Sequence, residues 1–163
     1  MKSVIKSIVF TVLSVSVMII IFLFSSQTGD ESREMSDQVR AVLEAIILNV
    51  MGAGELQERV FGTLELLLRK GAHAFLYALL GLFVAAALDS YGVKKNRFLI
   101  TIVFCFFYAV SDETHQYFVD GRNAAFTDVI IDTIGACAGY YVFYLFTKIT
   151  SACTPAKNPP AHV

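Results

Sequence analysis

The chain has 163 residues, of which 56% are hydrophobic, so it is too apolar for an ordinary soluble domain and long enough for only a few membrane spans. Its formal net charge is -1 and it contains no run rich in Lys and Arg, which excludes the electrostatic footprint that nucleic acid binding requires. We therefore expect one small polytopic membrane protein with the lipid bilayer as its first partner.

Four apolar segments predict four transmembrane helices, in chain order Val4–Phe24, Gly71–Leu88, Phe98–Val110 and Val129–Thr147. The first carries one charged residue, Lys6, near its start and is as long as the about 20 residues that a spanning helix needs. A cleaved signal peptide is the competing interpretation, because Lys2 and Lys6 precede the uninterrupted apolar run, but the length of this run and the lack of a small-x-small site favour a span. The third segment is short, so we expect its helix to continue through Tyr117 and Phe118.

The segment between the first two spans predicts amphipathic helices. Apolar residues recur there at helical spacing, first at Met35, Val39, Val42, Leu43, Ile46, Ile47 and Val50, and then at Leu56, Val60, Leu64, Leu67 and Leu68. Thr28 and Glu31 fit a capping box, and Gly52 and Gly54 can end the first helix. We expect both helices to lie along the outer membrane surface or to cap the bundle, with ordinary packing against the bundle as the alternative.

The distribution of charge predicts the orientation. With the N-terminus in the cytoplasm, one acid, Asp89, accompanies the basic residues of that side, which are Lys2, Lys6, Lys94, Lys95, Arg97, Lys148 and Lys157. This excess of Lys and Arg on short loops favours cytoplasmic termini. The fold class that we expect is an all-α integral membrane protein, a small bundle of about four transmembrane helices with amphipathic helices in the first extracytoplasmic segment. We expect one domain over residues 1–148 and a disordered cytoplasmic tail over 149–163, where all three prolines lie.

The stretch Ser111–Asp128 places ionisable side chains between two apolar segments, where each costs several kcal/mol unless it is paired. On a continued third helix, Asp112, Glu113 and Gln116 can share one face. On the fourth helix, Asp128 and Asp132 lie one turn apart. The same face continues through Gly135 and Gly139, a GxxxG pattern that allows a neighbouring helix to approach closely.

Two aspartates on successive turns repel each other, so a cation or a proton must lie nearby. Arg122 is the best single partner, because a guanidinium can hold a carboxylate through two parallel hydrogen bonds. We predict one polar network or ligand-binding site near the outer interface, made of Lys70, His73, Asp112, Glu113, Gln116, Arg122, Asp128 and Asp132. The alternative is that these residues only fix the register of the helices.

The sequence predicts no metal site and no cofactor. His73, Asp112, Glu113, His115 and Asp128 offer nitrogen and oxygen ligands, but their spacing matches no strong signature such as HExxH. A nucleophile is equally unsupported, because no GxSxG elbow surrounds Ser25, Ser26 or Ser111.

Several motifs in order resemble the VanZ-like family. They are Phe24-Ser-Ser-Gln27, Arg69-Lys-Gly-Ala-His73 with Phe75 and Tyr77, Asp112-Glu113 followed by Gln116, Gly121-Arg122, and Asp128-Val129 followed by Asp132, Gly135 and Gly139. The resemblance implies a small bacterial membrane protein, and the founding member is associated with resistance to teicoplanin-type lipoglycopeptides through reduced antibiotic binding at the cell surface. It implies no accepted reaction. Relatives often carry Asn in place of Asp132 and Pro in place of Asp120.

Three functions follow as hypotheses for a multi-pass protein of the bacterial plasma membrane. The first is an envelope protein that changes how lipid-linked cell-wall precursors or lipoglycopeptides meet the membrane. The second is an intramembrane enzyme acting on a lipid head group, with Asp112 or Glu113 as general base and Arg122 and Lys70 holding a phosphate. The third is an ion or proton carrier using Asp128 and Asp132. The candidate catalytic residues are therefore Asp112, Glu113, Arg122 and Asp128.

Overall fold

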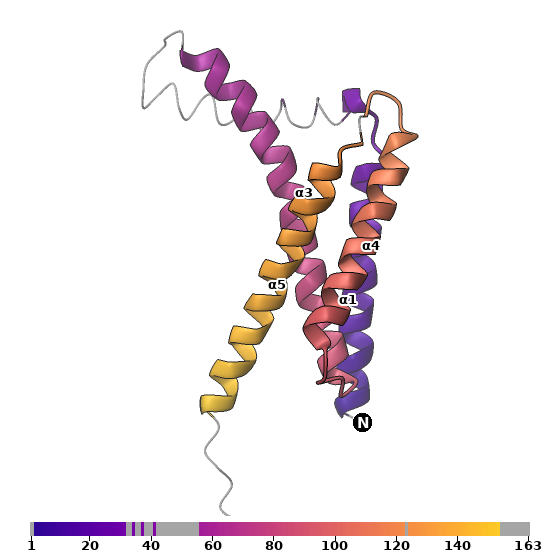
Figure 1. The fold of residues 1–163 in the computed structure, drawn as a ribbon, viewed down its shortest axis with the longest axis vertical. Helices are drawn as coiled ribbons and strands as arrows, with labels where there is room; N and C mark the ends of the chain where they lie inside the picture. The colour runs from indigo at the N-terminus through magenta and orange to yellow at the C-terminus, as the bar shows by residue number, and fades with distance from the viewer. Residues whose placement is uncertain are drawn as a thin grey trace, which may run out of the picture.

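The computed structural model describes residues 2–31, 34, 37, 41, 56–122 and 124–153. Its long elements over these residues are four α-helices, α1 (Lys2–Ser25), α3 (Leu56–Ser90), α4 (Arg97–Tyr117) and α5 (Phe126–Cys153) (Figure 1). Each contains a segment long and apolar enough to cross a membrane, namely Val4–Ser25, Leu67–Ser90, Arg97–Tyr117 and Phe126–Ala152. The predicted fold class, an all-helical membrane protein with four spans, is confirmed.

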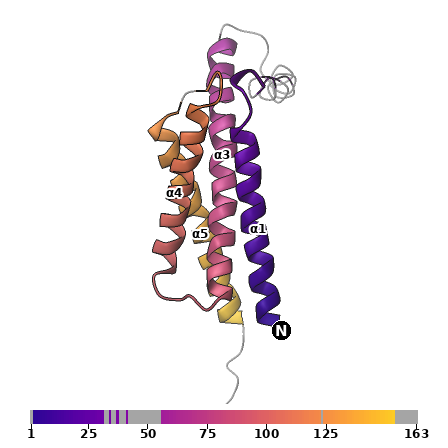
Figure 2. The same cartoon turned by 90° about the vertical axis from the view of Figure 1, so that its right-hand side faces the viewer.

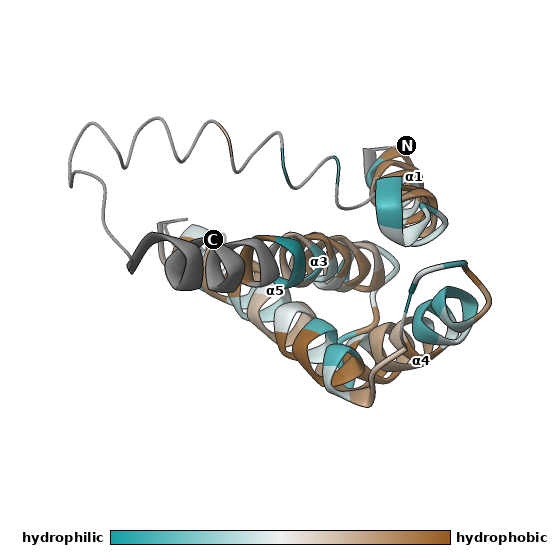
Figure 3. Cartoon of the chain, turned by 90° about the horizontal axis from the view of Figure 1, so that it is seen from above, coloured by the Kyte–Doolittle hydropathy of each residue, from teal (hydrophilic) through white to brown (hydrophobic). Residues whose placement is uncertain are grey.

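The four helices form a bundle in which α3 packs against each of the other three (Figures 1 and 2). The first residue of α1 and the last of α5 lie at the same end of the bundle, as an even number of spans requires. Seen from above, hydrophilic residues gather at the near ends of α1 and α4, whereas the bodies of the helices are mostly hydrophobic (Figure 3). The end of the bundle opposite the N-terminus is therefore polar where α1 and α4 reach it.

The bundle has a small interior and an apolar exterior. Tyr77, Leu80 and Cys105 are fully buried at its centre, whereas large apolar side chains such as Phe107 and Ile134 are more than half exposed. Exposed apolar side chains all around a helical bundle are the pattern of a surface that faces lipid rather than water.

Glycines allow α3 and α5 to approach closely. A Cβ atom placed on Gly139 would overlap the backbone of Ala78, and one placed on Gly135 would overlap the backbone of Ala74. From the other side, a Cβ atom on Gly81 would overlap the backbone of Ala136. The close helix approach predicted from the GxxxG pattern is confirmed, with α3 as the neighbour.

The second amphipathic stretch predicted from the sequence is not a separate surface helix. Leu56–Leu68 is continuous with the second span in α3, which runs without a break through Gly71 to Ser90. Gly71 does not interrupt the helix, because a long packed helix tolerates the about 1 kcal/mol by which a glycine weakens it. Most of the first predicted amphipathic helix, over residues 35–50, lies outside the described residues.

Two smaller predictions concern the ends of elements. The capping box is confirmed, since the Thr28 N–H donates to Glu31 Oε2 (2.9 Å) and the Glu31 N–H donates to Thr28 Oγ1 (3.3 Å). The predicted continuation of the third span is confirmed as far as Tyr117, where α4 ends, and Phe118 is the C-cap residue rather than part of the helix. At the other terminus α5 extends past Lys148 to Cys153, and residues 154–163 of the predicted tail lie outside the described residues.

Candidate functional site

A polar cavity of about 140 Å³ is lined by residues of α3, α4, α5 and the connection between α4 and α5. Helix α3 contributes Arg69, Lys70 and His73, and α4 contributes Glu113 and Gln116. The connection between α4 and α5 adds Gly121 and Arg122, and α5 adds Asp128, Ile131 and Asp132. Seven of the eight predicted network residues line this cavity, and the eighth, Asp112, is buried beside it with a 4% exposed side chain. The structure therefore brings the whole predicted set together.

Gln116 connects the interior of the bundle to the cavity. Its amide nitrogen donates to Asp112 Oδ2 and to Ser25 Oγ, both at 3.1 Å, and its amide oxygen accepts from Arg122 Nη1 at 3.3 Å. Because the nitrogen faces acceptors and the oxygen faces a donor, this network fixes the orientation of the amide. Gln116 thus links α1, α4 and the loop that follows α4.

Among the described residues, Arg122 donates to two backbone carbonyls and to Gln116 rather than to the carboxylate that the sequence predicted. Its Nη2 atom donates to the carbonyl oxygen of Phe24 (2.8 Å) and its Nε atom donates to that of Gln27 (3.0 Å). Carbonyl oxygens at the C-terminus of a helix lack partners within the helix and carry partial negative charge, so a guanidinium stabilises them. The sequence does not reveal these acceptors, because they belong to the backbone.

The environment of Arg122 contains charges of both signs. Burial, followed by the positive charge of Arg69, lowers the pKa of the Arg122 guanidinium, while Asp112 and Glu113 act in the opposite direction. The side chain still carries its charge at neutral pH, because arginine does not deprotonate in proteins. Arg69 and Arg122 line one cavity and supply N–H donors that an anion can accept from, and Glu113, Asp128 and Asp132 line the same cavity.

The partner of Asp128 is Lys70. The ammonium group of Lys70 on α3 forms an ion pair with Oδ1 of Asp128 on the first turn of α5, and each side chain is about one quarter exposed, at 28% and 27%. An acid on the first turn of a helix is also favoured by the helix dipole. Asp128 therefore ties α5 to α3 at the cavity wall.

Glu113 is held at the opposite wall by the backbone. Its Oε2 atom accepts a hydrogen bond from the N–H of Ala125 at 3.0 Å, just before α5 begins. The side chain is buried at 7% exposure and lines the cavity. A carboxylate oriented in this way can accept a proton or a hydrogen bond from a molecule in the cavity.

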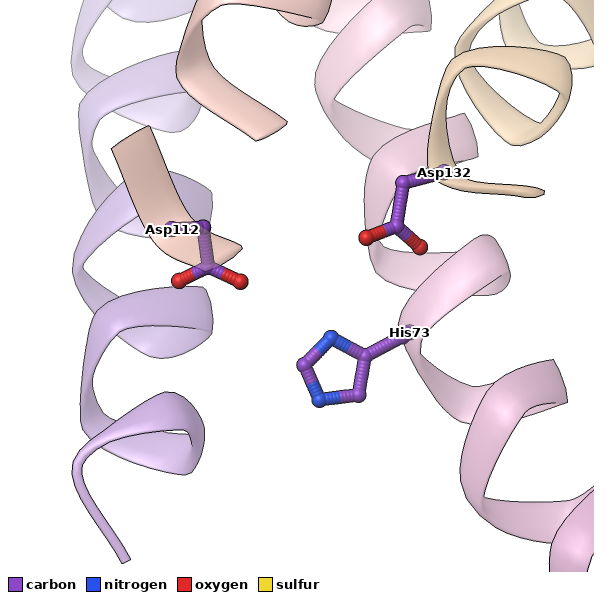
Figure 4. A group of neighbouring side chains, drawn as sticks. All are labelled: His73, Asp112 and Asp132. Carbon is purple, nitrogen blue, oxygen red and sulfur yellow. The ribbon is translucent and has the colours of Figure 1, made fainter. Parts of the chain in front are cut away.

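Three further groups from three helices meet at the inner part of the site. His73 of α3, Asp112 of α4 and Asp132 of α5 point toward one shared space (Figure 4). One ligand atom from each lies within 4.8 Å of the other two. Asp132 is as buried as Asp112, at 3% exposure.

His115 belongs to a different environment. Its ring stacks on Phe22 with ring centroids 4.7 Å apart, and its Nε2 atom lies 3.1 Å from Ser26 Oγ. The earlier set of possible metal ligands joined His115 to His73, but His115 does not line the cavity. Its role among the described residues is to pack α4 against the end of α1.

The family of the chain can be decided from its sequence as a whole. The profile of the VanZ/LLP1 family matches residues 10–147. The chain belongs to the VanZ/LLP1 family. The match covers every residue that lines the cavity, together with the close contact between α3 and α5. No curated protein and no solved structure matches the chain.

The VanZ/LLP1 motifs fall on positions that the structure joins. Ser25, which the sequence offered as part of a motif and as an unsupported nucleophile but not as a member of the network, accepts a hydrogen bond from Gln116 and is fully buried. Arg69, named in another motif but left out of the predicted network, lines the cavity beside Lys70. The signal that could have found both is the position of polar residues directly at the ends of apolar segments.

Proposed function

We propose that this VanZ/LLP1 protein binds the phosphate-bearing head group of a lipid-linked envelope component in the cavity and so reduces the access of lipoglycopeptides such as teicoplanin. The observation that carries this proposal is the pair of guanidinium groups, Arg69 and Arg122, at one polar cavity between apolar spans. A phosphate satisfies several N–H donors of arginine at once. The lipid tail of such a ligand would remain in contact with the apolar outer surface.

The side of the membrane is part of the proposal. We propose a bacterial plasma membrane location with both termini in the cytoplasm, which puts the cavity on the extracytoplasmic side. The support is the excess of basic residues at the opposite end of the bundle, where Lys94 and Lys95 are exposed. A single cysteine introduced at Asp120 should react with a membrane-impermeant maleimide in intact cells, and one at Lys95 should not. The reverse pattern would contradict this orientation.

Binding can be measured directly on the purified full-length protein by native mass spectrometry with a long-chain polyprenyl phosphate. We expect a one-to-one complex, and no complex with the corresponding free polyprenol, which lacks the phosphate. Arg122→Gln and Arg69→Gln should each weaken binding by roughly tenfold, which corresponds to the loss of one charge-assisted hydrogen bond of about 1.5 kcal/mol. The matched control is Lys95→Gln, which removes an exposed positive charge from the other end. Equal binding of the polyprenyl phosphate and the free polyprenol would contradict the proposal.

The cellular consequence is a change in susceptibility to teicoplanin. Expression in a susceptible bacterium should raise the inhibitory concentration, and Arg122→Gln should remove that increase at equal protein level. Lys95→Gln should retain it. If expression of the wild-type protein leaves teicoplanin susceptibility unchanged, the proposed role in resistance is wrong. The proposed binding of the head group is not affected by that result.

A second candidate function is chemistry on the same head group. The observation that favours it is Glu113, which is oriented by the Ala125 N–H and lines the same cavity as Arg122. With a phosphate held by Arg122, Glu113 would act as the general base. Lipid profiles of cells with wild-type protein or Glu113→Gln test this role. A head-group change that appears only with intact Glu113 supports catalysis, and identical profiles contradict it.

A further inference from the structure

Two buried aspartates face a histidine with no described cation between them. Asp112 and Asp132 are 4% and 3% exposed, and they come from different helices. Two carboxylates this close repel each other, and a low-dielectric surrounding strengthens the repulsion. Their arrangement therefore calls for a positive species in the space that they share with His73.

Two of the three Arg and Lys side chains that line the cavity are engaged elsewhere. Lys70 is paired with Asp128, and Arg122 donates to two backbone carbonyls and to Gln116. Among the described residues, no hydrogen bond or ion pair reaches the side chain of Asp132 or that of His73. An aspartate that is 97% buried, lines a cavity and has no described partner is an open ligand position.

The three side chains supply a donor set suited to a divalent transition metal ion. One imidazole nitrogen and two carboxylate oxygens are ligands that Zn²⁺ accepts, and three protein ligands with one open position is the usual arrangement of a reactive zinc site. Mg²⁺ and Ca²⁺ prefer oxygen ligands alone. The doubly positive ion would neutralise both carboxylates, which suits a buried position in a membrane bundle.

The spacing of the ligand atoms is close to that of a metal site. Three atoms within 4.8 Å of one another surround a point that is at most about 2.8 Å from each. Zinc binds nitrogen and carboxylate oxygen at about 2.0 to 2.2 Å, so each ligand atom has to move inward by no more than about 0.8 Å. Small rotations about the side-chain bonds of His73, Asp112 and Asp132 are sufficient.

We propose that His73, Asp112 and Asp132 form a binding site for one divalent transition metal ion, with Zn²⁺ as the preferred ion. The site joins α3, α4 and α5 at the inner side of the cavity. Its fourth coordination position faces the cavity and is open to water or to an anionic oxygen. The prediction of no metal site rested on spacing along the sequence, which does not detect ligands brought together from three helices.

The first test is the metal content and affinity of the purified full-length protein in detergent, free of added lipid phosphate. After exposure to Zn²⁺ and dialysis, elemental analysis should find one zinc ion per chain. Asp132→Asn, Asp112→Asn and His73→Gln should each weaken zinc binding by at least 10- to 100-fold, since even changes to groups behind the ligands have effects of that size. The matched control is Asp120→Asn, an exposed acid of the α4–α5 connection, which should bind zinc like the wild type.

The result that overturns the proposal is a wild-type protein without stoichiometric zinc, or ligand variants that bind zinc with wild-type affinity. A second measurement applies if a ligand variant does not fold. Asp132→Cys and His73→Cys each replace one ligand with a thiolate, which also binds transition metals. With Co²⁺ they should show a thiolate-to-cobalt charge-transfer absorption that the wild type and Asp120→Cys lack. The absence of this absorption from both folded thiolate variants contradicts the site.

The metal site and the binding of the head group are tested by independent measurements, so either proposal can be wrong while the other holds. Zinc binding is measured without lipid phosphate, and Arg122→Gln leaves all three metal ligands in place. Loss of polyprenyl phosphate binding in Arg122→Gln with one zinc ion retained supports two distinct functions of the site. A zinc-free protein that still binds polyprenyl phosphate contradicts only the metal site.

Discussion

Gln116 donates a hydrogen bond to Asp112 one helical turn earlier on α4, with 3.1 Å between Nε2 and Oδ2. The same amide accepts from Arg122, so a buried acid and a cavity-lining cation are held through one neutral side chain rather than by a direct ion pair. Two other nitrogen atoms of the Arg122 guanidinium, Nε and Nη2, donate hydrogen bonds to the backbone carbonyl oxygens of Gln27 and Phe24 at the end of α1. The α4–α5 connection is thereby fixed to α1.

Replacing this amide should destabilise the bundle. Gln116→Leu keeps a similar volume but leaves Asp112 Oδ2 and Arg122 Nη1 without these partners, which costs about 1 to 3 kcal/mol for each unsatisfied group. We expect that loss in the free energy of unfolding, measured by reversible denaturation in mixed micelles. Tyr117→Leu, at the adjacent position with a 70% exposed side chain, is the control and should change the unfolding free energy by less than about 0.5 kcal/mol. Equal effects of the two substitutions would show that Gln116 contributes no specific contact.

The close contact of α3 and α5 gives a second prediction. Gly139→Leu places a side chain where the backbone of Ala78 lies, so the two helices must separate. Overpacking of this kind costs about 1 to 3 kcal/mol. Ala138→Leu adds the same side chain at the exposed neighbouring position and should leave the unfolding midpoint nearly unchanged. A Gly139→Leu protein as stable as Ala138→Leu would mean that the helices are not in contact there.

The spans and the helix-packing motif were predictable because their signals are local. Four apolar segments of sufficient length, and Gly135 and Gly139 on the same face as Asp132, are visible in the sequence alone. The residues of the cavity were predictable as a set, because ionisable groups at the ends of apolar segments must gather to avoid lipid. The helix that packs against Gly135 and Gly139 could not be predicted, because a GxxxG pattern does not indicate which helix will be its neighbour.

The hydrogen-bond and ion-pair partners within the site could not be predicted from the sequence, and the reason is physical. Arg122 was expected to choose a carboxylate, but the carbonyl oxygens of Phe24 and Gln27 are available at the end of α1 and are set by backbone geometry. Asp128 then pairs with Lys70, which faces it from α3. His73, Asp112 and Asp132 come together only because α3, α4 and α5 pack against one another at the same height in the bundle. The spacing of residues along the sequence does not reveal this packing.

Acid should weaken the capping box after α1. Hydrogen bonds from the backbone and side chain of Thr28 lower the pKa of Glu31 below its ordinary value of 4.5. Because the folded-state pKa is the lower one, the stabilising contribution of the charged carboxylate is complete above pH 4.5 and is lost as the pH falls through the folded-state pKa. Titration of the Glu31 carboxyl by NMR should show a pKa below 4.5, and Thr28→Val should move that pKa upward. A pKa that does not respond to Thr28→Val would contradict the side-chain part of the capping box.

The ion pair between Lys70 and Asp128 should be measurable as a coupling energy. Lys70→Met and Asp128→Asn each remove one charge, and the double variant removes both, so a double-mutant cycle isolates the interaction. We expect a coupling of about 1 kcal/mol in the free energy of unfolding, because the pair is only partly buried and solvent weakens it. Asp128→Asn alone should be more destabilising than this coupling, since it also removes a negative charge from the first turn of α5, where the helix dipole stabilises it by about 0.3 to 1 kcal/mol. A coupling near zero would mean that the two side chains do not interact, and Asp128 would then act through the helix dipole alone.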